Sequence, residues 1–223
     1  MTTLNACLHL HVKGDPHEDI KHTAEEVILK AKSLGIQVIA ITCHEKVVYS
    51  DKIAQFGKKN GITVIPGIEA TVEKKHVLIL NADEDANSVN TFVKLASYKK
   101  SHPNCFILAP HPYYLVTSCL MGKLEKYIDL FDGIEWNYFY SNIINPNLKA
   151  MEMAKKYNKP LIGTSDVHDL KYLNPTYTAI ECENTEILSI INAMKQNKVK
   201  LITKKFSSLK LFHLLWVVYK ATH

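Results

Sequence analysis

Histidine and acidic residues recur in this sequence at the ends of short apolar runs. Imidazole and carboxylate groups are the ligands that zinc, manganese and iron take in proteins. Residues of these types in this arrangement could therefore hold a cluster of divalent metal ions. The candidate ligands are His9, His11, His17, His44, Glu69, His76, His111, Asp166 and His168.

The clearest local spacing is the HLH tripeptide, which contains His9 and His11. Alternate residues of a β-strand point to the same side of it, so both imidazoles could reach one ion. The other candidates end or open further apolar runs, which strengthens this interpretation. The remaining histidines lie at helix starts, in loops or at the tail, and we assign them no chemistry: His22, His102, His213 and His223.

The elements that must position these residues can be predicted from the apolar pattern. Short β-branched runs alternate with amphipathic segments, which is typical of repeated β-α units and a parallel sheet. Strands are expected at residues 4–12, 36–42, 62–70, 76–80, 105–110, 132–136, 160–166, 176–182 and 199–203. Helices are expected at residues 23–35, 48–60, 86–100, 121–131, 146–158 and 184–197. So many strands favour a barrel ringed by helices, with catalytic residues at the C-terminal ends of the strands.

The first and the last predicted helices carry distinct signals. Thr23 and Glu26 have the spacing of a capping box, and Gly35 follows the last turn of the same predicted helix. An apolar-faced helix is expected at about residues 206–221, and a homo-oligomer, if one forms, would be expected to use it. No linker or repeat interrupts the chain, so one domain spanning residues 1–223 is predicted.

The composition restricts the class of protein. A chain of 223 residues, 47% of them hydrophobic, is long enough to bury the core of one globular domain. Its formal charge of +5 comes from lysine alone, and the absence of arginine, which suits bidentate phosphate contacts, makes nucleic acid a disfavoured partner. The five cysteines contain no CxxC pair, so no disulfide framework is indicated. Neither a secretory signal nor a transmembrane segment is recognised, and a cytoplasmic location is expected.

Five motifs resemble, in their order along the chain, those of the polymerase-and-histidinol-phosphatase (PHP) family: HLH, TCHE, PGIEA, APHP and SDVH. The resemblance implies an α/β fold, a distorted (β/α)7 TIM-like barrel with two or three divalent ions (Zn, Mn or Fe) at the C-terminal ends of the strands. One ion would be held by His9, His11, Glu69 and Asp166. Glu69 would bridge to a second ion held with His76 and His111, and a third would be held by His17, His44 and His168. Glu69, Asp166 and His168 would be the catalytic residues.

Two positions depart from the family pattern. The family commonly has acidic residues where Cys7 and Cys43 stand here, and such carboxylates orient ligand imidazoles. The thiols could recruit zinc as soft ligands, but two small buried cysteines beside the site are the simpler expectation. Glu135 resembles a recurrent glutamate of the family and could be either a structural acceptor or a catalytic group.

The expected activity is hydrolysis of a phosphate ester by a metal-activated hydroxide, because clustered ions lower the pKa of a shared water and bind phosphoryl oxygens. The expected substrate of this phosphatase or phosphodiesterase is a small phosphorylated molecule, whose phosphate Lys13, Lys46 or Lys74 could contact. Two alternatives stay open. One is an amidohydrolase-type enzyme that cleaves C–N or C–O bonds, usually with a carboxylated lysine as bridging ligand. The other is a non-catalytic metal-binding PHP domain.

Overall fold

The computed structural model describes residues 1–206 of the chain. Its strands form one nine-stranded sheet in the order β7-β6-β5-β4-β3-β2-β1-β8-β9. The strands are β1 (Thr2–Leu10), β2 (Val38–Ile41), β3 (Thr63–Val72), β4 (Lys75–Leu80), β5 (Phe106–Ala109), β6 (Gly133–Asn137), β7 (Leu161–Thr164), β8 (Thr176–Cys182) and β9 (Val199–Thr203). The helices are α1 (Ala24–Ser33), α2 (Asp51–Lys59), α3 (Phe92–Ser101), α4 (Gly122–Lys126), α5 (Asn147–Lys156) and α6 (Ile187–Lys195), with short 3-10 turns η1 (Glu84–Ser88), η2 (Ile128–Leu130) and η3 (Leu170–Tyr172).

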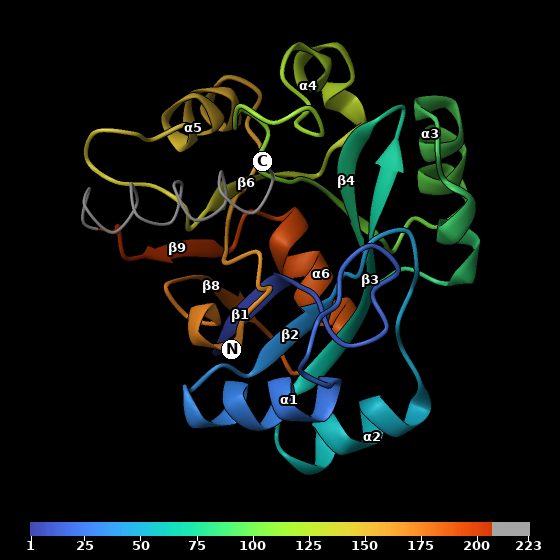
Figure 1. Ribbon diagram of the computed structural model, residues 1–223, viewed down its shortest axis with the longest axis vertical. Coiled ribbons are helices and arrows are strands. Elements are labelled where there is room, and N and C mark those ends of the chain that lie inside the picture. The colour runs from blue at the N-terminus through green and yellow to red at the C-terminus, as the bar shows by residue number, and fades with distance from the viewer. Residues whose placement is uncertain (207–223) are drawn as a thin grey trace.

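The sheet curves into a nearly closed barrel (Figure 1). β1, β2 and β3 run parallel, as do β5, β6 and β7, while β4 is antiparallel to both of its neighbours. Just past β7, the Val167 N–H donates to the His9 carbonyl at 3.1 Å, and the His11 N–H donates to the Val167 carbonyl at 3.0 Å. This bridge joins the end of β7, an edge strand of the sheet, to the end of β1 and so closes this part of the barrel.

The predicted TIM-like α/β barrel is confirmed, but a strict (β/α)7 count is not. β3 and β4 form a hairpin with no helix between them, and β8 and β9 pair antiparallel beside β1. The hairpin turns at Glu73 and Lys74, whose φ angles are +48° and +67°. Positive φ at both central residues matches the twist of the two strands in a two-residue hairpin. β4 therefore begins at the edge where β3 ends.

Three apolar clusters hold the strands and helices together. The barrel interior contains residues of most strands, such as Leu8 and Phe106, and the apolar face of α6 packs on them through Ile190 and Met194. One outer cluster lies between the sheet and α1 and α2, and another between the sheet and α3, α4 and α5. These helices surround the strands (Figure 1). The core thereby fixes the strands whose ends carry the polar residues described below.

A bulge in β1 sets the direction of its two histidines. Between Cys7 and Leu10, β1 advances three residues while β2 advances two. Leu8 belongs to the interior cluster, whereas Leu10 packs in the outer cluster under α1. His9 and His11 therefore point to the inner side, where both are fully buried. Bulges commonly re-aim side chains beside active sites in this way.

The capping box predicted for the first helix is present in α1. Thr23 Oγ1 accepts from the Glu26 N–H at 3.3 Å, and Glu26 Oε2 accepts from the Thr23 N–H at 2.8 Å. Gly35 follows the helix with a φ of +70°, a conformation that suits glycine. The local signals at both ends of α1 therefore agree with the structure.

The helix predicted at about residues 206–221 lies, after its first residue, outside the described part of the chain. That helix, the oligomer contact expected through it and the single domain of residues 1–223 stay predictions. Within residues 1–206, no helix combines the length and apolar character needed to cross a membrane.

Gly163 of β7 lies where the chain has no room for a side chain. A Cβ atom there would lie 2.5 Å from Leu201 Cδ1 and 2.8 Å from the Tyr177 carbonyl oxygen. Because a backbone oxygen in a strand cannot yield easily, we expect Gly163→Ala to lower the free energy of unfolding by about 1–3 kcal/mol in urea titrations. Gly122→Ala is the control, since a Cβ atom at Gly122 meets nothing within 4 Å. Equal stability of the two variants would contradict this prediction.

Candidate metal centre

The structure brings eight of the nine predicted ligands together at one end of the barrel. They form four overlapping groups, and the ligand atoms of each group lie within 4.8 Å of one another. The groups are His9–His11–Asp166, His9–Glu69–His111, His44–Glu69–His76 and His11–His44–His168. Most of these residues lie on or just past the C-terminal ends of parallel strands, while His76 lies at the start of the antiparallel β4. The C-terminal ends of the parallel strands and the N-terminal end of β4 therefore lie at the same rim of the barrel.

Glu69 is the centre of this cluster. Its side chain is 1% exposed. Its Oε2 lies 3.2 Å from His9 Nε2, 3.4 Å from His11 Nε2 and 3.3 Å from His44 Nε2, and its Oε1 lies 2.7 Å from His76 Nδ1 and 3.2 Å from His111 Nε2. Burial alone raises the pKa of Glu69, but the surrounding imidazoles, His9 foremost, outweigh burial and hold that pKa well below its usual value. The two oxygens of an ionised carboxylate therefore face two different sets of imidazoles.

Two residues of the cluster have a left-handed backbone. The φ angle of His111, just past β5, is +28°, and that of Asp166, just past β7, is +45°. This conformation is costly for residues with a Cβ atom and occurs in turns and at active sites. Asp166 Oδ1 lies 3.2 Å from His9 Nε2 and 3.6 Å from His11 Nε2. The strained turns thus direct both side chains at the cluster.

Two carboxylates behind the cluster orient its imidazoles, and Asp15 was not among the predicted residues. Asp15 Oδ2 lies 2.8 Å from His11 Nδ1 and 3.0 Å from His44 Nδ1. Glu135 Oε1 lies 2.8 Å from His9 Nδ1, and Glu135 also accepts from the backbone N–H of His111. A carboxylate at Nδ1 favours a proton on that nitrogen and leaves the Nε2 lone pair free for an ion. Of the two roles open to Glu135, the structure supports that of an acceptor.

Cys7 and Cys43 are small buried thiols beside the site, as expected. Cys43 Sγ accepts from the Val12 N–H at 3.4 Å. Burial raises the pKa of Cys7 to about 12 and that of Cys43 to about 11, so neither is a thiolate near neutral pH. Neither belongs to a group of candidate ligands in the described part of the chain. The carboxylates that contact the Nδ1 atoms of His9 and His11 are those of Glu135 and Asp15.

Two ring nitrogens of the cluster fit a metal ion better than a hydrogen bond. His11 Nε2 and His76 Nδ1 are buried and have no hydrogen-bond partner among residues 1–206. An oxygen of Glu69 lies 2.7 Å from His76 Nδ1, but the geometry is not that of a hydrogen bond. Leaving a buried polar atom unpaired costs about 1–3 kcal/mol, whereas a bound cation would use its lone pair. Imidazoles and carboxylates together are a suitable set of donors for divalent ions.

We expect the metal-free protein to lose stability as the pH rises above neutrality. Burial lowers the pKa of His9, but the charges of Asp166, Glu69 and Glu135 outweigh burial and raise it to about 10. A raised histidine pKa stabilises the fold fully below the unfolded value of about 6.5, and this stabilisation is lost as the pH rises towards the folded value. The urea concentration at the midpoint of unfolding should therefore decrease as the pH is raised from about 6.5 to about 10. A midpoint that stays constant or rises over that range would contradict the prediction, and bound divalent ions should remove the effect by replacing the proton.

The ninth predicted ligand, His17, lies beside the cluster. Its ring centroid is 5.4 Å from that of His44, but its side chain is 47% exposed and its Nε2 lies 3.0 Å from Glu45 Oε2. The lysines considered as phosphate contacts are exposed and are not among the residues that line the cavity over the cluster: Lys13, Lys46 and Lys74.

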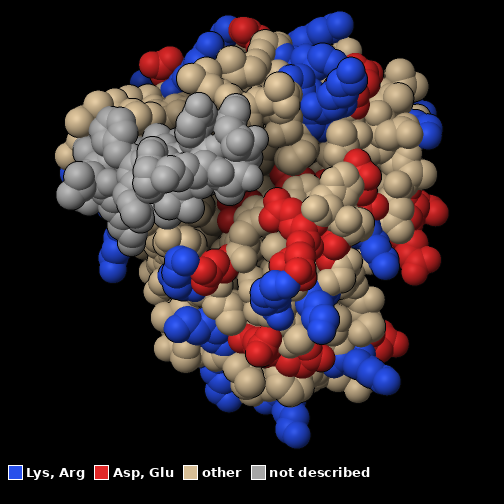
Figure 2. Space-filling view, in the orientation of Figure 1, with Lys and Arg blue, Asp and Glu red and all other residues tan. Residues whose placement is uncertain are grey.

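A cavity of about 430 Å³ opens over the cluster. Six of the predicted ligands line it: His44, Glu69, His76, His111, Asp166 and His168. Glu18 lines it as well, and Glu18 Oε2 lies 3.3 Å from His168 Nε2. Figure 2 shows acidic side chains gathered near the middle of the face in view. The cavity joins the candidate ligands to solvent, and Glu18 is the one acidic residue of its described lining that is not a candidate ligand.

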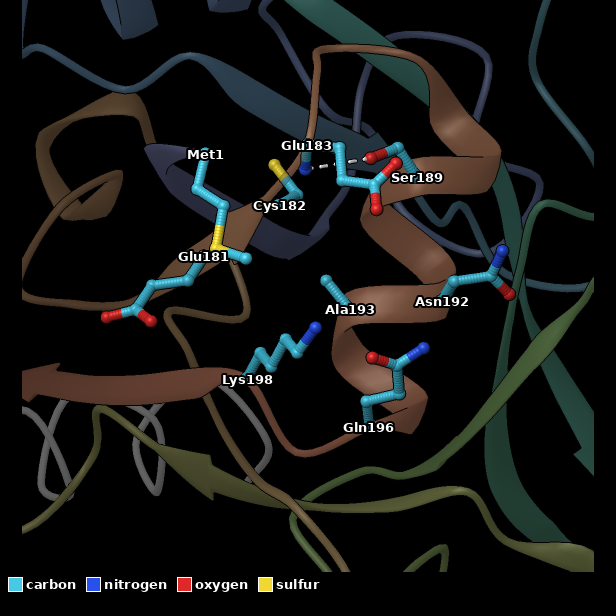
Figure 3. Close-up of a pocket in the computed structure, with 9 residues that line it drawn as sticks. All are labelled: Met1, Glu181, Cys182, Glu183, Ser189, Asn192, Ala193, Gln196 and Lys198. Atoms are coloured by element: carbon cyan, nitrogen blue, oxygen red, sulfur yellow. Dashed lines mark hydrogen bonds between the residues drawn. The ribbon is translucent and has the colours of Figure 1, made fainter.

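A second polar cavity lies at the other end of β1. Figure 3 shows it between the N-terminus, β8 and α6, with Met1, Glu181 and Lys198 among its lining residues. Its volume is about 130 Å³, and the Glu183 N–H at its edge donates to Ser189 Oγ at 3.2 Å. It contains none of the predicted ligands. We assign it no function.

Comparisons with known proteins agree with this architecture. The sequence matches the family model described as PHP domain over residues 9–165, and the model described as PHP-associated over residues 145–199. It is 28% identical to DNA polymerase III subunit alpha of Aquifex aeolicus (strain VF5), over 75% of this chain and 18% of that protein. The chain thus spans less than a fifth of the length of this curated relative.

Solved structures share the fold. A two-domain protein of Bacteroides vulgatus, described as containing a predicted PHP-like metal-dependent phosphoesterase, has a TM-score of 0.69 and 19% identity, over 91% of this chain and 65% of that one. The lesion-specific endonuclease Q of Pyrococcus furiosus has a TM-score of 0.64 and 13% identity, over 96% and 66%. An amidohydrolase of Chromobacterium violaceum has a TM-score of 0.56 and 13% identity, over 88% and 97%. Because the PHP domain model also matches most of the sequence, residues 9–165, the chain belongs to the PHP domain family.

Proposed function

We propose that this chain is a metal-dependent phosphoesterase that hydrolyses an ester of a small phosphorylated molecule. The observation that carries the proposal is Glu69, a buried carboxylate whose two oxygens face two sets of imidazole nitrogens. This is the arrangement that a ligand bridging two ions requires. Membership of the PHP family, and the neighbour described as a metal-dependent phosphoesterase, support hydrolytic activity.

The proposed ligands divide among the ions by position. His9, His11, Glu69 and Asp166 would hold one ion, and Glu69 with His76 and His111 a second. His17, whose ring centroid lies 5.4 Å from that of His44, would join His44 and His168 at a third. Bound zinc, manganese or iron would polarise a phosphoryl oxygen and lower the pKa of a water. Glu69, Asp166 and His168 are the proposed catalytic residues, and the last two border the open side of the cavity, with side chains 21% and 36% exposed.

The neighbours with other activities define the alternatives. An amidohydrolase usually bridges its ions with a carboxylated lysine, whereas the described lining residues of this cavity include no lysine. Glu69 fills the bridging position instead, which favours phosphoester chemistry. An endonuclease would need cations along a polyanionic backbone, and the described lining residues of this cavity include no lysine, which disfavours that substrate.

The test is hydrolysis of a panel of phosphate monoesters and diesters by the metal-loaded protein and by the same protein after chelation. We expect phosphate release only from the metal-loaded protein, and recovery when metal is added back. Parallel assays with cyclic amides test for amidohydrolase activity, and assays with abasic duplex DNA test for endonuclease activity. No hydrolysis of any ester, with two or three ions bound per chain, would overturn the proposal and favour a non-catalytic metal-binding domain.

A further inference from the structure

We propose that the preferred substrate is a phosphate monoester whose leaving group is aromatic and carries no charge. The inference rests on the proposed phosphoesterase function and adds the substrate class to it. Its basis is the contrast between the two parts of the cavity, a floor of ionisable ligands and a wall of apolar side chains.

The apolar wall comes from the loops that follow β5 and β6. The first loop contributes Tyr114, Leu115 and Val116, and the second contributes Tyr138 and Phe139. Leu115 is 94% exposed and Val116 57% exposed, although both are large and apolar. Adjacent apolar side chains at the mouth of a cavity that also contains convergent polar groups mark a ligand surface. Three rings on this wall favour an aromatic partner, which can contact them by stacking or edge to face.

The wall is held in place by hydrogen bonds. Tyr114 Oη donates to the Phe139 carbonyl at 3.0 Å and so joins the two loops. The His76 N–H donates to the Ser118 carbonyl at 2.8 Å, which ties the first loop to the strand that carries a candidate ligand. Because the surface is already ordered, a leaving group that binds to it meets a smaller entropic cost.

The charges around the cavity select against a second anionic group. Among its described lining residues there is no lysine, and the acidic residues are Glu18, Glu69 and Asp166. The bound ions would offset one phosphate. A further phosphate or carboxylate on the leaving group would approach Glu18 and find no cationic side chain to offset it. An uncharged ring avoids this repulsion.

The experiment compares three monoesters with leaving groups of similar basicity: benzyl phosphate, methyl phosphate and 4-carboxybenzyl phosphate. Using the metal-loaded full chain, we expect kcat/KM for benzyl phosphate to exceed that for methyl phosphate by about 10- to 100-fold, the effect of burying one ring. We expect the carboxylated ester to be poorer than benzyl phosphate by about tenfold. Calorimetric binding of benzylphosphonate and methylphosphonate, which cannot be hydrolysed, should follow the same order.

A double variant tests the wall directly. Because Leu115 and Val116 are exposed, Leu115→Ser with Val116→Ser should leave the fold intact, and we expect the ratio of benzyl to methyl kcat/KM to fall by about fivefold or more. Val93→Ser is the matched control, since Val93 is an apolar residue of α3 that is 77% exposed. The control should keep the wild-type ratio.

The outcomes separate this inference from the proposed function. Equal kcat/KM for the benzyl and methyl esters, or a higher value for the carboxylated ester, would overturn the inference and leave the phosphoesterase standing. If no ester is hydrolysed but benzylphosphonate binds more tightly than methylphosphonate, the proposed function fails and only the selectivity of the cavity wall for an aromatic group stands. If no ester is hydrolysed and the phosphonates bind alike, both fail.

Discussion

Replacing Glu69 by glutamine is expected to abolish ester hydrolysis, with kcat lower by at least about a thousandfold. Glutamine keeps the size of the side chain but removes the negative charge that two ions would share. Each oxygen of Glu69 now lies within 3.4 Å of at least two imidazole nitrogens, and the amide would turn an N–H₂ group towards one set. We therefore also expect at least one ion per chain to be lost, measured by elemental mass spectrometry.

The matched control for this variant is Glu152→Gln on α5, which removes the same charge from an exposed side chain. It should bind the wild-type amount of metal and keep wild-type kcat. Circular dichroism of both variants would show whether the fold is retained. A Glu69→Gln protein with full metal content and more than about a tenth of the wild-type kcat would contradict a bridging role.

The gathering of the ligands could be predicted from the sequence because of how a parallel barrel is built. His44 and His111 each follow a short apolar run, and the C-terminal ends of parallel strands meet at one rim. Residues that are far apart in the chain, such as His9 and Asp166, are then neighbours in space. The residue types at the strand ends were therefore enough to predict that eight of these side chains meet at one rim.

The direction of β4 could not be predicted in the same way. Its turn is formed by Glu73 and Lys74, whereas asparagine and glycine are the usual signals of a two-residue hairpin. The apolar run of residues 76–80 was therefore predicted as one more strand of a parallel barrel, whereas β4 is antiparallel to both of its neighbours. His76 still reaches the cluster, because an antiparallel strand begins at the rim where β3 ends.

The bulge in β1 and the role of Asp15 also depend on tertiary structure. The bulge adds one residue without a break in the apolar run, so only the pairing with β2 reveals it. Asp15 stands in a polar loop, where an aspartate is normally solvent-exposed. Its partner His44 is 29 residues away in sequence. An acidic residue four positions after the HxH motif was the only available signal.

Replacing Asp15 by asparagine is expected to weaken metal binding by about 10- to 100-fold, the usual effect of losing a group that orients a ligand. Burial raises the pKa of Asp15, but the imidazole of His11 and the backbone N–H of His44 outweigh burial and lower it below its usual value. The ionised carboxylate can thus accept from the Nδ1–H of both rings. Asparagine has one acceptor oxygen. With that oxygen facing the two rings, its amide group would face the backbone N–H groups of His17 and Glu18; turned round, the amide group would face the rings and they would lose their fixed orientation. Competition with a chromophoric chelator would measure the loss of affinity.

The metal dependence of activity distinguishes positioning by Asp15 from direct catalysis. If Asp15 acts only by orienting His11 and His44, the variant should recover most of its kcat at saturating metal, because the ligands themselves remain. Asp19→Asn is the matched control, since Asp19 lies in the same loop with a side chain that is 84% exposed, and its metal affinity should equal that of the wild type. An Asp15→Asn protein with unchanged affinity would show that the ions hold the imidazoles without help. A kcat that stays low at saturating metal would instead mean that the carboxylate acts on the reacting groups themselves.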